Sequence, residues 1–84
     1  MNKIIIYSAA YCPYCSQAKD LLDSLKLPFE ELKIDADPKI MQEMLKKTGG
    51  KKTIPQIFIN DKHVGGFDNL QDLVQQDKLT SYLK

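Results

Sequence analysis

The sequence predicts an α/β fold in which three helices flank a central mixed four-stranded sheet, in the order β-α-β-α-β-β-α. A strand, a helix and a second strand follow one another within about 34 residues, which implies a right-handed crossover and a parallel pair of strands. A second amphipathic helix is followed by two short strands separated by a tight turn, and this pattern predicts an antiparallel hairpin. A last apolar stripe at helical spacing adds the third helix.

Length and composition indicate a single small domain, residues 1–84. Of the 84 residues, 43% are hydrophobic and 27% are charged, and the net charge is +1. A chain of this size buries only about 60–65% of the surface of its unfolded form, so its core must be efficient. The sequence lacks the basic excess that nucleic acid or an acidic membrane selects, so neither is expected as a partner, and we expect a monomer.

The N-terminal segment predicts a cytoplasmic protein. The apolar run from Ile4 to Tyr7 is shorter than a signal-peptide core of about 7–15 residues and far shorter than a membrane span. In the cytoplasm the thiol pool keeps ordinary disulfides reduced. Two closely spaced cysteines in such a protein are therefore more often catalytic than structural.

The elements of the first half are predicted from apolar spacing. The run from Ile4 to Tyr7 is continuous rather than alternating, which is typical of a central strand covered on both faces. A helix is expected from Pro13 to about Leu25, because its apolar residues recur on one face. Leu27-Pro28 ends this helix, and residues 29–34 are expected to form the second strand.

The elements of the second half are predicted from capping and turn residues. Asp37 followed by Pro38 indicates a helix start, and Gly49-Gly50 indicates its end. The third strand is expected at 56–59, and the turn Asn60-Asp61-Lys62 leads into the fourth. Asp68 is expected to cap the last helix. The apolar residues of that helix and of a final short turn are Leu70, Leu73, Val74, Leu79, Tyr82 and Leu83.

Both cysteines of the chain, Cys12 and Cys15, lie where the first strand meets the first helix. Proline is favoured at the first helical position, so Pro13 places Cys12 at the N-cap and Cys15 in the first turn. The free amides and partial positive charge of a helix N-terminus favour the thiolate form of Cys12. A thiolate is the attacking species in disulfide exchange, and Cys15 is close enough to resolve a mixed disulfide formed on Cys12.

A structural disulfide and a zinc site are the alternative roles for this pair. A disulfide between Cys12 and Cys15 would close a loop of only four residues, for which chain entropy gives roughly 2 kcal/mol of stabilisation. Structural zinc sites use four ligands, and with His63, the sole histidine, the chain supplies three of the usual Cys and His ligands. The residues therefore favour thiol-transfer chemistry, with no metal expected.

Three motifs follow one another along the chain: Cys-Pro-Tyr-Cys after the first strand, Thr53-Ile54-Pro55 before the hairpin, and Gly65-Gly66-Phe67-Asp68 before the last helix. In this order, over essentially the whole chain, they resemble a dithiol glutaredoxin of the thioredoxin-fold superfamily. The resemblance implies a thioredoxin-like fold and a glutathione-disulfide oxidoreductase that reduces glutathione mixed disulfides and protein disulfides. The implied partners are glutathione and glutathionylated or disulfide-containing proteins, with ribonucleotide reductase as one candidate.

The resemblance also implies roles for individual residues. Cys12 matches the nucleophile and Cys15 the resolving thiol. Thr53, Ile54 and Pro55 match a loop beside the nucleophile, in which the proline is cis and the Ile54 backbone pairs with the cysteine residue of glutathione. The other implied glutathione contacts are Tyr14, Lys52, Gly66, Phe67 and Asp68.

Each end of glutathione has implied contacts. The amides of Phe67 and Asp68 match those that receive the α-carboxylate of the γ-glutamyl end, and the Asp68 side chain is available to its ammonium group. Lys52 is a candidate for the glycine carboxylate, with Lys51 and Gln42 as further candidates. Tyr14 flanks the ligand.

Two positions depart from the usual family pattern. Ala9 stands where family members commonly carry a lysine near the thiolate, so one positive charge is missing. Asn69 stands where many carry an aspartate, so the contact with the ligand's ammonium group depends on Asp68 alone.

Two functional alternatives are also compatible with the sequence. The first is a dimer that binds an iron–sulfur cluster with glutathione as an extra ligand; such relatives usually carry Gly or Ser near the cysteine instead of Pro13. The second is a thioredoxin-like electron donor that a flavoenzyme reduces directly.

Overall fold

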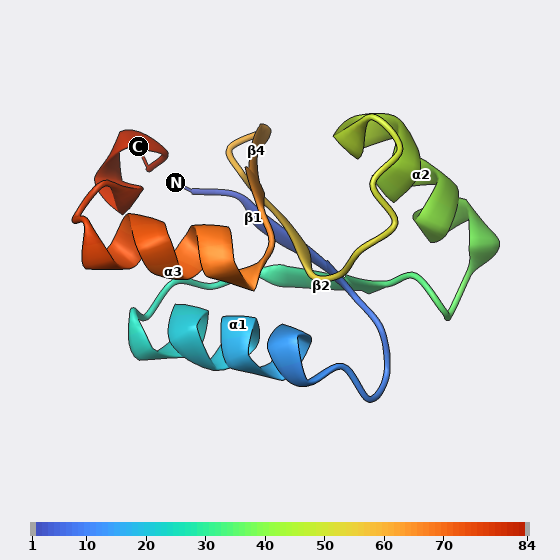
Figure 1. Ribbon diagram of the computed structural model, residues 1–84, viewed down its shortest axis with the longest axis horizontal. Coiled ribbons are helices and arrows are strands. Elements are labelled where there is room, and N and C mark those ends of the chain that lie inside the picture. Colours follow the sequence, from blue (N-terminus) through green and yellow to red (C-terminus); the bar gives the residue numbers. More distant parts are fainter. Residues whose placement is uncertain (1, 84) are drawn as a thin grey trace.

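The computed structural model describes residues 2–83, and it confirms the predicted fold and order of elements (Figure 1). Within residues 2–83, no helix has both the length and the apolar character needed to cross a membrane. The elements are β1 (Ile4–Ser8), α1 (Pro13–Ser24), β2 (Glu30–Lys33), α2 (Pro38–Thr48), β3 (Gln56–Ile59), β4 (Lys62–Gly65), α3 (Phe67–Gln75) and the 3₁₀ helix η1 (Leu79–Ser81).

The sheet is mixed, with the strand order β2-β1-β3-β4. β1 pairs with β2 in parallel and with β3 antiparallel, and β3 pairs antiparallel with β4. All five residues of β1 are buried, as the continuous apolar run predicts for a central strand. The hairpin turn consists of Asn60 and Asp61, which both adopt positive φ, as a two-residue type I′ turn requires.

The sheet carries a separate hydrophobic core on each face, because successive side chains of a strand point to opposite sides. Ile4 and Ile6 of β1 belong to a cluster that includes residues of α1 and α3, whereas Ile5 and Tyr7 pack with Met44 of α2. Accordingly, α1 and α3 lie together on one side of the sheet and α2 lies on the other (Figure 1).

The first two helices begin as their capping residues predict. Cys12 is the N-cap of α1 and Pro13 is its first residue. Asp37 caps α2 by accepting a hydrogen bond from the Lys39 amide at 2.9 Å, and α2 ends at Gly49, which is left-handed with φ 74°. The cysteine pair is therefore held between the central strand and a helix that packs on the core.

The start of α3 corrects one prediction: Gly66, rather than Asp68, is the N-cap, and Asp68 lies in the first turn. The side chain of Asn69 turns back, and its Oδ1 accepts a hydrogen bond from the Gly66 amide at 3.1 Å. Aspartate is also favourable inside a first turn, where it faces the positive end of the helix dipole. Its presence near a helix start therefore did not identify the cap.

Candidate active site

The two cysteines differ sharply in their surroundings. Cys12 is partly exposed at the opening of α1, whereas Cys15 is buried with 1% of its surface exposed, and both are free thiols. Cys12 has extended backbone geometry, and its Sγ accepts a hydrogen bond from the Cys15 amide at 3.3 Å. A backbone donor at a helix N-terminus thus faces the outer sulfur.

The inner thiol is held in its protonated form. Burial, and then the hydrogen bond to Cys12, raises the pKa of the Cys15 thiol to about 12. The Ala9 backbone and the charge of Lys19 act in the opposite direction but do not outweigh these causes. At neutral pH the reduced pair therefore has one sulfur placed for attack and one that keeps its proton.

Alkylation is expected to separate the two cysteines. Iodoacetamide reacts with thiolates, so at about pH 7.5 it is expected to modify Cys12 in the folded protein and to leave Cys15 unmodified. Peptide mass spectrometry after a timed reaction measures this, with protein unfolded in guanidinium, where both thiols react, as the control. Modification of Cys15 at a rate close to that of Cys12 in the folded protein would contradict this assignment of roles.

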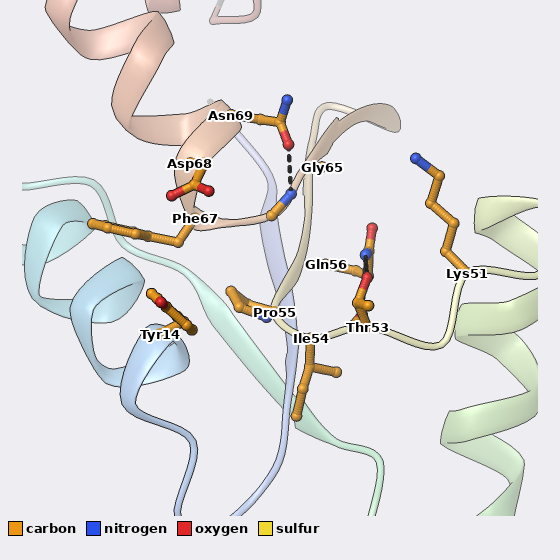
Figure 2. A pocket seen from close by; sticks show the side chains of 11 residues that line it. Tyr14, Lys51, Thr53, Ile54, Pro55, Gln56, Gly65, Phe67, Asp68 and Asn69 are labelled. Carbon is orange, nitrogen blue, oxygen red and sulfur yellow. Dashed lines mark hydrogen bonds between the residues drawn. The ribbon is translucent and has the colours of Figure 1, made fainter.

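A pocket of about 220 Å³ lies beside the start of α1 (Figure 2). Four segments line it: Tyr14 of α1, residues 51 and 53–56 before and at the start of β3, residues 65–66 at the end of β4, and residues 67–69 of α3. Cys12 is two residues before Tyr14 and precedes the same helix. The fold thus brings the three sequence motifs to one place.

Most of the predicted ligand contacts line this pocket, and Lys52 does not. The predicted residues that line it are Tyr14, Thr53, Ile54, Pro55, Gly66, Phe67 and Asp68. Lys51, the neighbouring lysine, lines the pocket where Lys52 was expected. Gln42 lies instead in a separate hollow on α2, with Lys39 and Glu43.

Aromatic and apolar groups form one wall of the pocket. The rings of Tyr14 and Phe67 stack with their centroids 6.4 Å apart and an angle of 29° between their planes. This contact joins the beginnings of α1 and α3, while 59% of the Tyr14 surface stays exposed. Ile54 and Pro55 are joined by a cis peptide bond, as the resemblance implies.

The pocket is charged at both ends. Lys51 lies at one end, and Asp68 lies at the other, in the first turn of α3 (Figure 2). The first N–H groups of a helix have no partner inside the helix, so the amides of Phe67 and Asp68 offer donors beside the Asp68 carboxylate. A ligand that fits both ends carries an anionic group at one end and both an anionic and a cationic group at the other.

Sequence reasoning did not identify Gln56, Gly65 and Asn69, which also line the pocket. Gln56 is only 2% exposed, and its Nε2 donates hydrogen bonds to the carbonyl oxygen of Thr53 at 3.0 Å and to Thr53 Oγ1 at 3.1 Å. Its Oε1 lies 2.7 Å from Nε2 of His63. A glutamine at the start of an otherwise apolar strand was the available signal, because a buried amide requires hydrogen-bond partners.

His63 is packed as a neutral ring. It stacks on Phe58 with the ring centroids 4.8 Å apart. Burial, and then the positive charge of Lys51, lowers the pKa of His63 below its ordinary value of 6.5. The unfolded chain therefore binds a proton on this histidine more readily than the folded chain does.

The free energy of unfolding is consequently expected to fall as the pH is lowered below about 6.5, the range in which the unfolded histidine takes up its proton. Thermal unfolding between about pH 7.5 and 5.5 measures this. His63→Phe, which keeps an aromatic ring on Phe58, is expected to reduce the fall. Hydrogen bonds from Ser8 and then Lys19 lower the pKa of Glu31. The stability that Glu31 contributes is therefore lost in a more acidic range than the one measured here. An equal fall in both proteins would contradict the role of His63.

Comparison with known proteins agrees with the fold and the cysteine pair. The sequence model of the Glutaredoxin family matches residues 4–64. The chain is 44% identical over 85 residues to glutaredoxin 1 of Rickettsia conorii, covering 100% of this chain and 83% of that protein. It is 43% identical over 84 residues to glutaredoxin 3 of Escherichia coli, covering 100% of both.

A solved structure shows the same arrangement of elements. The crystal structure of a buckwheat glutaredoxin–glutathione complex superimposes with a TM-score of 0.85 at 33% sequence identity, covering 98% of this chain and 76% of that chain. The two relatives align with this chain over its whole length, and the buckwheat structure has the same fold. This chain belongs to the glutaredoxin family, a class of thiol-disulfide oxidoreductases.

Proposed function

We propose that this protein uses glutathione to reduce glutathione mixed disulfides and protein disulfides through Cys12 and Cys15. The observation that carries the proposal is a partly exposed sulfur that caps α1 next to a pocket charged at both ends. Membership of the glutaredoxin family supports the same reaction. No metal is needed for it.

The first step is an exchange of one disulfide for another. The Cys12 thiolate attacks the glutathione sulfur of a mixed disulfide, the old S–S bond breaks, and the substrate thiolate leaves and takes a proton from water. Cys12 is then linked to glutathione. A second glutathione thiolate can attack this bond, which releases glutathione disulfide and restores the Cys12 thiolate.

Cys15 provides the other route for the second step. Its thiolate attacks Cys12, glutathione leaves, and a disulfide between Cys12 and Cys15 remains for glutathione to reduce. Once Cys12 is in a mixed disulfide, it no longer carries a thiolate charge or accepts the Cys15 thiol hydrogen. In the reduced pair, the Cys12 charge and the hydrogen bond to Cys12 both raise the pKa of Cys15. Loss of both in the first step therefore makes the Cys15 thiol easier to deprotonate.

The pocket matches the charges of glutathione. The γ-glutamyl α-carboxylate is assigned to the amides of Phe67 and Asp68, and its ammonium group to the Asp68 carboxylate. The glycine carboxylate is assigned to Lys51, because Lys51 lines the pocket and Lys52 does not. The Ile54 backbone is assigned to pair with the central peptide of the ligand, as an added strand does.

The proposed setting follows from this reaction. The protein works as a monomer of one domain in the cytoplasm, where glutathione is available. Its substrates are glutathionylated or disulfide-containing proteins, among which ribonucleotide reductase is a candidate.

A coupled assay with hydroxyethyl disulfide tests the proposal. NADPH consumption in the presence of glutathione and glutathione reductase is expected to depend on this protein. A parallel reaction contains thioredoxin reductase and no glutathione, and it is expected to show little turnover. Turnover with thioredoxin reductase alone, and none with glutathione, would overturn the proposal in favour of a thioredoxin-like donor.

A further inference from the structure

We propose that Gln56 is a positioning residue that orients the Thr53 hydroxyl as a hydrogen-bond donor toward a bound thiol peptide, and that His63 holds the Gln56 amide in place. The proposal rests on the proposed use of glutathione and adds residues that determine how its glycine carboxylate is recognised. Figure 2 shows Gln56 and Thr53 side by side between Pro55 and Lys51.

The direction of the hydrogen bonds follows from the groups involved. The carbonyl oxygen of Thr53 can only accept, so the nitrogen of the Gln56 amide must face it. The amide oxygen therefore faces His63, and the ring nitrogen Nε2 must carry a hydrogen to donate across the 2.7 Å contact. The hydrogen bonds thus run in one direction, from His63 to Gln56 to Thr53.

This direction determines what Thr53 can offer a ligand. Its Oγ1 accepts a hydrogen bond from Gln56 at 3.1 Å, so the hydroxyl hydrogen points away from the amide. Thr53 lines the pocket together with Lys51. The hydroxyl hydrogen and the Lys51 ammonium group are then two donors on the same side of the pocket, a pair suited to a carboxylate.

The anchoring also fixes the segment that precedes β3. Thr53 lies outside the sheet, and Gln56 holds both its carbonyl oxygen and its hydroxyl. Because Gln56 is 2% exposed, water does not compete freely for its amide. His63 is held in turn by its stacking on Phe58, so the hairpin and the pocket wall are joined through side chains.

An equilibrium measurement in the Cys15→Ser background tests the proposal. The protein is equilibrated with glutathione and its disulfide, or with β-mercaptoethanol and its disulfide, and the mixed disulfide on Cys12 is quantified by mass spectrometry. β-Mercaptoethanol has a thiol but no peptide or carboxylate. The ratio of the two equilibrium constants therefore reports recognition of the peptide and is insensitive to general changes in Cys12.

Gln56→Leu is expected to lower the ratio about fivefold, the effect of losing one ordinary hydrogen bond. Thr53→Val is expected to lower it by a similar factor, and the double variant no further than either, because the two residues act through the same donor. The β-mercaptoethanol equilibrium measures any general change at Cys12, and the ratio corrects for it. An unchanged ratio in Gln56→Leu, or effects that multiply in the double variant, would overturn the proposal.

His63→Phe provides a second route if Gln56→Leu does not fold, as judged by circular dichroism. It keeps the stacking on Phe58 and removes the donor to Gln56, so the ratio is expected to fall, and an unchanged ratio would count against the proposal. A parent protein with no preference for glutathione would instead contradict the proposed function. The two failures are therefore distinguishable.

Discussion

Cys12→Ser is expected to abolish glutathione-coupled reduction of hydroxyethyl disulfide, with a loss of at least about a thousandfold, whereas Cys15→Ser retains it. A serine hydroxyl is far less acidic than a thiol and forms no disulfide, so no covalent intermediate can form at position 12. Cys15 is buried and protonated in the reduced pair, so it cannot replace Cys12. Initial rates at saturating glutathione measure both variants.

A protein disulfide is the informative second substrate. Cys15→Ser lacks the intramolecular route, so its rate with a protein disulfide is expected to fall much more than its rate with a glutathione mixed disulfide. Circular dichroism controls for folding, because Cys15 lies in the buried part of α1. Activity that survives in Cys12→Ser would show that the two roles are assigned the wrong way round.

Gly65→Ala is expected to weaken both the fold and the pocket. Gly65 has φ +118°, a conformation that costs a residue with a side chain about 1–3 kcal/mol. A Cβ atom there would lie 2.6 Å from Oδ1 of Asn69, the atom that accepts the Gly66 hydrogen bond at the start of α3. Moving Asn69 frees that amide and shifts the first turn of α3, where Phe67 and Asp68 line the pocket.

Denaturant unfolding and the KM for a glutathionylated peptide measure the two effects. Gly50→Ala is the matched control, since Gly50 also has positive φ, at +100°, but has nothing within 4 Å of its Cβ position and does not line the pocket. It is expected to lose stability from backbone strain alone and to keep its KM. Equal KM values for Gly65→Ala and the parent protein would show that the turn into α3 does not shape the pocket.

Much of the fold was predictable because its signals are local. The unbroken apolar run of β1 indicated a strand buried on both faces, and the proline after Cys12 fixed the helix start. The turn at Asn60 and Asp61 was readable because these residue types tolerate positive φ. Each of these features depends on a few neighbouring residues, so no knowledge of tertiary contacts was needed.

The missed features of the site depend on contacts between distant segments. Lys51 and Lys52 are neighbours of the same type, and only the path of the backbone decides which one lines the pocket. Gln56 and His63 meet because β3 and β4 pair antiparallel with His63 opposite Phe58, two residues from Gln56 along β3. Residue types and their spacing along the chain do not identify this contact.

The central claim is that glutathione bound to Cys12 occupies the pocket between α1, the segment before β3 and the start of α3. Two-dimensional NMR of ¹⁵N-labelled Cys15→Ser, before and after glutathione is attached to Cys12, tests it most directly. The largest shifts are expected at the backbone amides of Tyr14, Ile54, Phe67 and Asp68. Unchanged signals at these residues, with shifts confined to α2 or η1, would contradict it.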